Sequence, residues 1–362
     1  MKRLCMLLVT LLCLTGCSKT EVSPKYTPAY TASSATSEEN TPLFQYLYGN
    51  SSLDIGIVSG DYQQGTPDIC YLLDTQDGVV SSALLFSPKN ISNARCLGVD
   101  GQDGIWFQGK DSQNSACIVR YDTSGKVLLN IDLGHQMPFL PVSGFSWDSA
   151  SYYFLIQGND DCWLIQYDLA GAEIFRRSLK DYYMDTSGYL PMEEDWKEDL
   201  EGRTDDRLLT ILFPDGPINQ LGLIQFQDGT IGMMIRRQSP IDGEAYNIIC
   251  TLEDGCAKAV PRYYYALETE HSIQLSSYFP SNDPKYDLLV NQLSGLYGVN
   301  LQEETMDLLI TWADAGYQAM NLSTYGTTPH VPPNACPGPG GTLWFYDRGQ
   351  ERNIFTLLTP VA

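Results

Sequence analysis

The stretch "IVRYDTSGKVL" (118–128) puts a phenol beside a carboxylate, at Tyr121 and Asp122. Such neighbours could act as a general acid–base pair, because that chemistry uses two titratable groups in different environments. The three histidines are isolated from one another, and the sequence contains no Gly-x-Ser-x-Gly, no His-Glu-x-x-His and no glycine-rich phosphate loop followed by lysine. Enzymatic activity therefore stays open, and the sequence favours a protein without it.

Two acidic turns offer the oxygen ligands that calcium prefers, "DGQDG" at 100–104 and "GNDD" at 158–161. Neither turn matches a 12-residue calcium-binding loop, and turn formation alone accounts for both. No Cys-x-x-Cys occurs among the 10 cysteines, which argues against a zinc site of the usual spacing. We therefore predict no cofactor, with calcium as the open alternative.

Aromatic side chains outside the strand pattern are the better indication of a binding site. Tyr182, Tyr183 and Trp196 lie in a strongly acidic stretch, and Tyr263 and Tyr264 lie in "RYYYAL". Aromatic rings exposed on a rigid scaffold suit sugars or peptides as ligands, while ordinary packing is the competing interpretation. These five residues form the predicted ligand-binding site.

The phrase around Asp122 recurs along the chain as an apolar run, a polar turn residue, a short turn and a second apolar run. The turn residues are separated by 48, 46, 85 and 47 positions and are Asp74, Asp122, Asp168, Glu253 and Asn300. Because Asn replaces the acid in one copy, this residue is expected to bond the nearby backbone rather than to transfer protons. Each copy is predicted to be a β-hairpin.

A second phrase, a turn followed by a strand, occurs at 101–109, 150–158, 226–235 and 338–347. With the apolar stretch ahead of it, each unit holds about four short strands in about 46 residues, which is typical of a β-propeller. We predict an all-β fold, a propeller of six to seven four-stranded blades over residues 43–362. An array of β-sandwiches or a right-handed β-helix would need a longer or a shorter period.

Repeat position also assigns three large aromatic residues to packing. Trp106 and Trp344 occupy the same place in their second phrases, and Tyr121 aligns with apolar residues in the other hairpins. Aromatic rings at such repeated positions are expected to fill the space between strands and sheets. Any site should then lie in the loops that interrupt the repeat.

The largest interruption is residues 181–207, which we predict to be an insertion on one face of the propeller. Its centre, "PMEEDWKEDLEG", has the features of a short helix, with Pro191 and acids at the start and Gly202 at the end. The insertion could be a lid or a partner-binding element. A solvated surface helix is the alternative.

The chain carries a formal net charge of −22. This charge argues against nucleic acid as a partner and against peripheral binding to an anionic membrane surface. It is compatible with cations or cationic ligands, and also with an acidic surface that only keeps the protein soluble.

The amino terminus has the organisation of an export signal. Lys2 and Arg3 precede the apolar run 4–14, which is too short to cross a bilayer as a helix. The sequence Leu14-Thr15-Gly16-Cys17 follows and resembles a bacterial lipobox.

This resemblance implies that residues 1–16 are a signal peptide and that Cys17 is lipidated with acyl chains such as palmitate. Residues 17–42 are rich in Ser, Thr and Pro and are predicted to be a flexible tether. The protein would then lie at the cell surface, on the extracytoplasmic face of a bacterial membrane. An oxidising location would allow disulfides, and Cys250 with Cys256 is the predicted pair.

The stretch 283–316 carries a family resemblance in Tyr286-Asp287, in Gly295-Leu296-Tyr297-Gly298, and in Leu308-Leu309 with Trp312 and Gly316. It resembles a blade of surface lipoproteins from Gram-positive anaerobes. In these proteins a β-propeller-like region often precedes an extracellular solute-binding domain. The final strand-like stretch, 353–362, is similar to the end of such regions. The printed chain has no solute-binding domain after Ala362, so either a shorter member or a fragment is expected.

We therefore expect a lipid-anchored propeller that binds a ligand or a protein, with membrane transport or surface proteins as partners and a link to solute uptake. The ligand could be a carbohydrate or a peptide. A surface glycan-active enzyme is the alternative, because two carboxylates at the propeller mouth could cleave a glycosidic bond. A spacer without a ligand is the third possibility.

Overall fold

The computed structural model describes residues 27–61, 64–76, 79–134, 142–157, 162–181, 183–185, 221–238, 245–253, 256–259, 278–281, 283–291, 295–300, 303, 305–316, 334–338, 341–348 and 353–361. This described part is built from strands β1 to β25 and one turn of 3₁₀-helix, η1 (Leu179–Asp181). Among these residues there is no helix with the length and apolarity that a bilayer crossing requires.

The first three blades are regular four-stranded antiparallel sheets. Blade 1 consists of β2 (Tyr46–Gly49), β3 (Asp54–Val58), β4 (Ile69–Gln76) and β5 (Val79–Phe86). Blade 2 consists of β6 (Ser92–Val99), β7 (Ile105–Lys110), β8 (Ala116–Tyr121) and β9 (Val127–Gly134). Blade 3 consists of β10 (Val142–Trp147), β11 (Ser151–Gln157), β12 (Cys162–Asp168) and β13 (Glu173–Ser178).

The other three blades follow the same plan with one added strand. Blade 4 consists of β15 (Leu221–Gln225), β16 (Ile231–Gln238), β17 (Ala245–Glu253) and β18 (Cys256–Ala259), and β14 (Tyr183–Asp185) lies at its edge. Blade 5 consists of β19 (Tyr278–Pro280), β20 (Leu288–Asn291), β21 (Gly295–Asn300) and β22 (Thr305–Thr311). Blade 6 consists of β23 (Asn334–Pro337), β24 (Leu343–Arg348), β25 (Asn353–Pro360) and β1 (Tyr30–Ser37).

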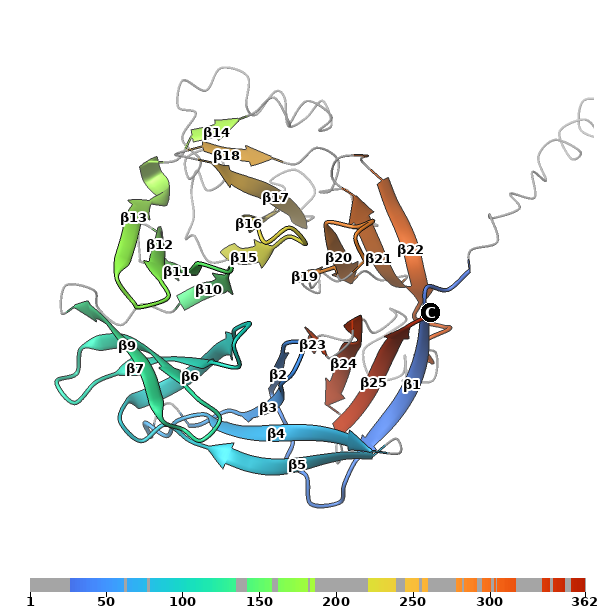
Figure 1. The fold of residues 1–362 in the computed structure, drawn as a ribbon, viewed down its shortest axis with the longest axis horizontal. Coiled ribbons are helices and arrows are strands. Elements are labelled where there is room, and N and C mark those ends of the chain that lie inside the picture. The colour runs from blue at the N-terminus through green and yellow to red at the C-terminus, as the bar shows by residue number, and fades with distance from the viewer. Residues whose placement is uncertain are drawn as a thin grey trace, which may run out of the picture.

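The blades stand in a ring, with the first strand of each blade nearest the centre (Figure 1). The fold is therefore a β-propeller, and the described strands form six blades, within the predicted six to seven. Because neighbouring strands within a blade are antiparallel, the loops between first and second strands emerge on the same side as the hairpins between third and fourth strands. We call this side the lower face.

The ring is closed by the amino-terminal strand β1, which is the outer strand of the last blade. β1 pairs antiparallel with β25 from Tyr30 opposite Pro360 to Thr36 opposite Ile354, and it also makes a short parallel contact with β5 of blade 1. Figure 1 shows the blue β1 beside the red β25. Closure by pairing of the two ends of the chain leaves no open sheet edge between the first and last blades.

The prediction that 17–42 is a flexible tether is thus wrong for Tyr30–Ser37. The strand reads "YTASSATS" and buries few apolar side chains, chiefly Tyr30 and Ala35, so its own pattern resembles a linker. Its partner β25 lies more than 300 positions away, beyond the reach of local sequence patterns. The signal peptide 1–16 and Cys17 lie outside the described residues.

The repeat is confirmed as the organisation of the blades. The predicted second phrases form β7, β11, β16 and β24, which are all second strands, and the five hairpins all join third to fourth strands. In the β8–β9 hairpin, Oδ1 of Asp122 accepts hydrogen bonds from the backbone N–H groups of Ser124 (2.9 Å) and Lys126 (3.0 Å). The Ser124 hydroxyl also donates to this oxygen (2.6 Å), and this bond, followed by the backbone bonds, lowers the pKa of the Asp122 carboxyl. Asp122 is therefore a turn residue, as predicted.

Apolar clusters fill the spaces between adjacent blades rather than a single central core. Separate clusters lie between blades 1 and 2, between blades 2 and 3, between blades 5 and 6 and between blades 6 and 1. Trp106, Trp344 and Tyr121 are all buried in these layers, which confirms the packing role predicted for them. Blades 1, 2, 3, 5 and 6 are therefore each packed against a neighbouring blade, and their lower-face loops rest on packed sheets.

Two predictions concern blade 4. The insertion 181–207 begins with η1 and β14, which adds an edge strand parallel to β18, and the predicted helix lies outside the described residues.

The predicted disulfide between Cys250 and Cys256 is not compatible with the strand register, because Cys256 stands opposite Glu253 whereas Cys250 stands opposite Ala259. Three positions along a strand span about 10 Å, which exceeds the Cα separation of about 7 Å that a disulfide tolerates.

Candidate functional site

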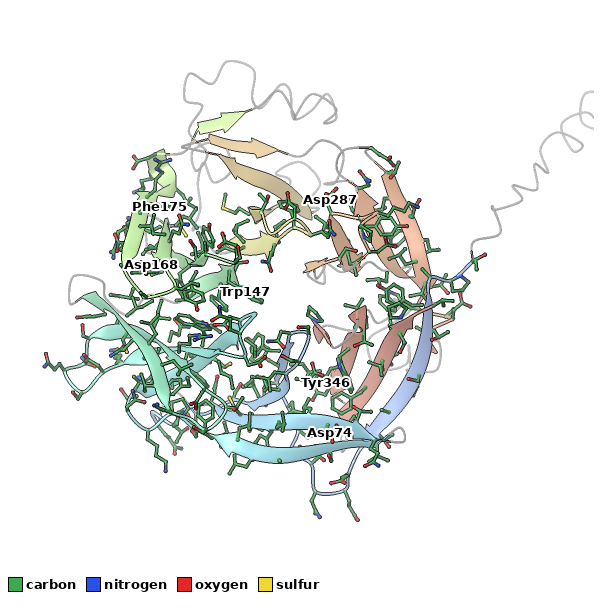
Figure 2. All side chains as sticks on the ribbon, viewed as in Figure 1. Asp74, Trp147, Asp168, Phe175, Asp287 and Tyr346 are labelled. Atoms are coloured by element: carbon green, nitrogen blue, oxygen red, sulfur yellow. The ribbon has the colours of Figure 1, made fainter. Side chains whose placement is uncertain are left out.

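A groove of about 760 Å³ opens on the lower face, where loops from blades 2, 3 and 4 meet. Its walls come from the β6–β7, β10–β11 and β15–β16 loops, with one residue from the β12–β13 hairpin. This volume is typical of ligand pockets in proteins. Figure 2 shows Trp147 at the inner margin of its blade, toward the centre of the ring, and Phe175 on the outer strand β13.

Trp147 is the central aromatic side chain of the groove and is the last residue of β10. Its indole ring stacks on Phe145, with ring centroids 5.7 Å apart and an interplanar angle of 29°. A Cβ atom on Gly101 would lie 2.9 Å from the indole nitrogen, so only glycine allows the neighbouring loop to approach this edge. Trp147 is therefore fixed by two blades and remains only partly buried.

Asp148 follows Trp147 and is held in a tight turn. Its Oδ1 accepts a hydrogen bond from the backbone N–H of Ala150 (2.7 Å), and its Oδ2 accepts one from the hydroxyl of Tyr153 (2.7 Å). The hydrogen bond to Asp148 and the burial of the ring raise the pKa of Tyr153 to about 12, burial being the larger cause. The carboxylate is thus oriented by its own blade before any ligand arrives.

The β15–β16 loop forms the opposite wall of the groove. Oδ1 of Asp228 accepts a hydrogen bond from the backbone N–H of Thr230 (2.8 Å), and Gly229 completes the turn at a φ of +84°. The loop is tied to its neighbours at both sides. The amide of Gln225 donates to the carbonyl of Trp147, and the N–H of Gln227 donates to the carbonyl of Asp287 (2.7 Å).

Asp100, the third acid of the groove, is occupied by an internal ion pair. Its carboxylate accepts hydrogen bonds from Arg120 (Nε to Oδ2, 2.6 Å; Nη2 to Oδ1, 3.0 Å), from the indole of Trp106 (2.7 Å) and from the backbone of Gln102 and Gly104. Burial alone would raise the pKa of Asp100, but these hydrogen bonds outweigh it and lower the pKa below its ordinary value. The acid predicted as a calcium candidate in 100–104 thus serves its own turn and the guanidinium.

Further hydrogen bonds join the loops of blades 1 and 2. The Asn50 amide donates to the carbonyl of Asp100 (2.7 Å) and to Oδ1 of Asp103 (2.9 Å), and the Ser52 hydroxyl donates to the same Asp103 oxygen (2.5 Å). Hydrogen bonds therefore connect the lower-face loops of blades 1 and 2 and those of blades 3, 4 and 5, and the close approach of Gly101 to Trp147 lies between these two groups. A groove built on such connected loops is largely preorganised for binding.

A second tryptophan–aspartate contact lies where blade 6 meets blade 1. Oδ1 of Asp54 is shut off from solvent, and neither this oxygen nor the nearby indole nitrogen of Trp344 has a hydrogen-bond partner among the described residues. Burial raises the pKa of Asp54 to about 7, and the Trp344 indole opposes this only in part. A Cβ atom on Gly49 would lie 2.4 Å from that oxygen and 2.7 Å from the carbonyl oxygen of Pro337. The Asp54 carboxyl is therefore closely surrounded by backbone, and the neighbouring Pro337 carbonyl can only accept hydrogen bonds.

Most residues of the predicted aromatic site lie outside the part of the chain that the structure describes. Tyr182, Trp196, Tyr263 and Tyr264 lie outside the described residues, and Tyr183 is described only as a backbone position of β14. Within the described ranges, no group of three or more His, Cys, Asp or Glu side chains gathers as metal ligands. The "GNDD" turn at 158–161 also lies outside them.

Sequence reasoning missed Trp147. In "GFSWDSA" this residue reads as one more strand aromatic, and its importance comes from loops 45 to 80 positions away in the chain. The available signal was its place as the last apolar residue of a first strand, directly before an Asp-Ser turn. In a propeller that place faces the central mouth.

The comparisons with known proteins do not assign this chain to a family. No family model matches the chain, and no curated protein matches it either. The solved structures similar to this chain include the N-terminal domain of Nup159, with 9% identity over 92% of this chain and 97% of that chain and a TM-score of 0.42. They also include a mutant of AofleA from Arthrobotrys oligospora, with 11% identity over 92% of this chain and 88% of that chain and a TM-score of 0.46. The WD40 domain of coronin from Toxoplasma gondii has 8% identity over 93% of this chain and 88% of that chain and a TM-score of 0.43. Because the TM-scores are below 0.5, the assignment of the propeller rests on the sheet topology described above.

Proposed function

We propose that this chain is a lipid-anchored, extracytoplasmic β-propeller that binds a partner protein through the lower-face groove. Propellers commonly present binding surfaces on the loops at one end of a rigid ring. The observation that supports binding here is the groove of about 760 Å³ around Trp147, whose blade 3 and blade 4 loops are hydrogen-bonded to each other. A partly exposed tryptophan in a preformed groove is the kind of side chain that anchors interfaces.

The location and the transport link rest on the sequence. The lipobox ending at Cys17 supports a lipid anchor outside the cytoplasm, and the resemblance of residues 283–316 supports an association with solute uptake. Only the residues between Cys17 and Tyr30, where β1 begins, would then join the propeller to the membrane. A partner in the same membrane would therefore be within reach of the lower face.

A glycan-active enzyme is the second candidate, because Asp148 and Asp228 face the same groove from neighbouring blades. Glycosidases need one carboxyl group to donate a proton and another to act as base or nucleophile. Here both carboxylates already accept hydrogen bonds from their own turns. That arrangement suits fixed charges better than groups that exchange protons during a reaction.

Site-specific photo-crosslinking tests the binding site. A benzophenone amino acid at the groove residue Gln227 should capture a protein in producing cells, and Trp147→Ala should abolish that capture. The matched control carries the probe at Ser124, an exposed residue in the β8–β9 hairpin that does not line the groove. Equal capture from both positions, or capture from Gln227 that survives Trp147→Ala, would contradict the proposal.

The anchor is tested separately by Cys17→Ala. The wild-type protein should fractionate with membranes and partition into detergent, and the variant should not. Release of reducing sugar from a glycan panel, lost in Asp148→Asn or Asp228→Asn, would instead support the glycan-active candidate.

A further inference from the structure

The groove has an unbalanced negative charge. Among the described residues, its lining contains three carboxylates, Asp100, Asp148 and Asp228, and no lysine, arginine or histidine. Asp100 is neutralised by Arg120, whose Nε lies 2.6 Å from Oδ2. Neither Asp148 nor Asp228 makes an ion pair with another side chain in the described part of the chain. Two fixed negative charges therefore remain, in a chain whose formal net charge is −22.

The aromatic wall of the groove adds an independent preference for a cation. One face of the Trp147 ring is covered by Phe145 and one edge by Gly101. Because the residue lines the groove, the surface that remains is available to a ligand. The face of an indole attracts ammonium and guanidinium groups through the negative charge density of its ring.

Polar groups around the charges suit a peptide backbone. Gln102 and Gln227 line the groove as exposed amides, which can donate and accept hydrogen bonds at once. The groove is also larger than one guanidinium group requires, so residues on both sides of a basic side chain would fit. An anionic ligand would meet Asp148 and Asp228 without a compensating cation.

We propose that the groove binds an arginine or lysine side chain on an extended segment of the partner protein, against Trp147 and between Asp148 and Asp228. This inference rests on the proposed function and specifies the chemistry of the partner. The charges supply attraction over a distance, and the tryptophan supplies the contact.

The test uses two acetylated and amidated peptides, Gly-Ser-Arg-Ser-Gly and the same sequence with citrulline in place of arginine. Citrulline keeps the shape of arginine without its charge. Titration followed by the indole N–H signals in ¹⁵N NMR spectra should show at least tenfold tighter binding of the arginine peptide. That preference should weaken as sodium chloride rises from 50 to 500 mM.

Turn-preserving variants then locate the charges. Asp148→Asn with Asp228→Asn keeps the Oδ1 acceptors for Ala150 and Thr230 but removes both charges, and it should abolish the preference for arginine. Asp122→Asn makes the same change in an equivalent turn away from the groove and should leave the preference intact. Thermal unfolding of each variant checks that the fold persists.

Three results would overturn the inference, and the first two concern the preference for arginine. One is equal binding of the two peptides by the wild-type protein, and the other is an arginine preference that survives removal of both charges. If neither peptide binds while crosslinking from Gln227 still depends on Trp147, the groove is a binding site but its ligand is not a basic peptide. Failure of the crosslinking itself would instead remove the proposed function.

Discussion

The lower face contains two tryptophan–aspartate contacts that differ in one feature. Trp106 and Trp344 are both the second residue of a second strand, and both lie between blades. Trp106 donates its indole N–H to Asp100, which also binds Arg120. Trp344 lies near Asp54, which has no guanidinium partner among its described contacts and whose Oδ1 accepts no hydrogen bond.

The two carboxyl groups consequently differ in charge, although Asp100 is fully buried and Asp54 is partly buried. Burial opposes ionisation at both sites, but the pKa of Asp100 is lowered and that of Asp54 is raised to about 7. Hydrogen-bond partners rather than burial therefore decide the charge state. On the groove side the charge is fixed, whereas at the junction of blades 6 and 1 a proton can be gained or lost near neutral pH.

Removing the guanidinium should have the largest effect. Arg120→Met leaves Asp100 ionised and unpaired, which should lower the free energy of unfolding by about 3 to 5 kcal/mol. Chemical denaturation at pH 7 measures this loss, and the added change Asp100→Asn should recover much of it. The control Arg176→Met breaks the exposed ion pair with Glu173 and should cost less than about 1 kcal/mol. Equal losses in the two single variants would contradict the comparison.

Replacing each indole should have an intermediate effect that differs between the sites. Trp106→Phe removes a hydrogen bond to a charged acceptor, whereas Trp344→Phe removes an N–H that lies near Asp54 but meets no hydrogen-bond geometry with any described residue. Trp106→Phe should therefore be less stable than Trp344→Phe by about 2 kcal/mol. Urea denaturation of both variants at pH 7 measures the difference. A larger loss in Trp344→Phe would mean that the junction site has a hydrogen bond after all.

The smallest effect is the pH dependence contributed by Asp54. The folded protein holds a proton at Asp54 up to a pKa of about 7, whereas the unfolded chain releases it near 4. Because the folded state binds the extra proton between these values, this group lowers stability as the pH rises from about 4 to about 7. Asp54→Asn removes that penalty and should be more stable than the wild type at pH 8, by about 1 to 2 kcal/mol after allowance for solvent screening.

The gain should be much smaller at pH 5, where the wild-type carboxyl is still protonated in the folded state. Denaturation at the two pH values provides the measurement. The matched variant Asp100→Asn should lose stability at both. A gain from Asp54→Asn that does not depend on pH would show that packing rather than the proton is responsible.

The sequence was informative where local chemistry repeats. The hairpin residues Asp74, Asp122 and Asp168 and the second-strand residues Trp106 and Trp344 recur in register, so blades and packing positions could be predicted. The blade count fell within the predicted range. The turn role of Asp122 followed from its replacement by Asn300 in another copy.

The rest depended on contacts between distant parts of the chain. β1 has a polar, linker-like sequence and becomes a strand only by pairing with β25. Trp147 acquires its groove from loops of three blades, and Asp54 meets Trp344 only after the ring closes. No sequence pattern within a single repeat indicates the groove or the difference in pKa between Asp54 and Asp100.

The central physical claim is that hydrogen-bond partners determine the charges of the lower face, which leaves the groove charge to Asp148 and Asp228. ¹³C NMR titration of the aspartate carboxyl groups tests this claim most directly, with Asp54→Asn and Asp100→Asn used to assign the signals. We expect Asp54 to titrate near pH 7, and Asp100 to titrate at a lower pH than an ordinary aspartate. Titration of both groups at the same ordinary pH near 4 would contradict it.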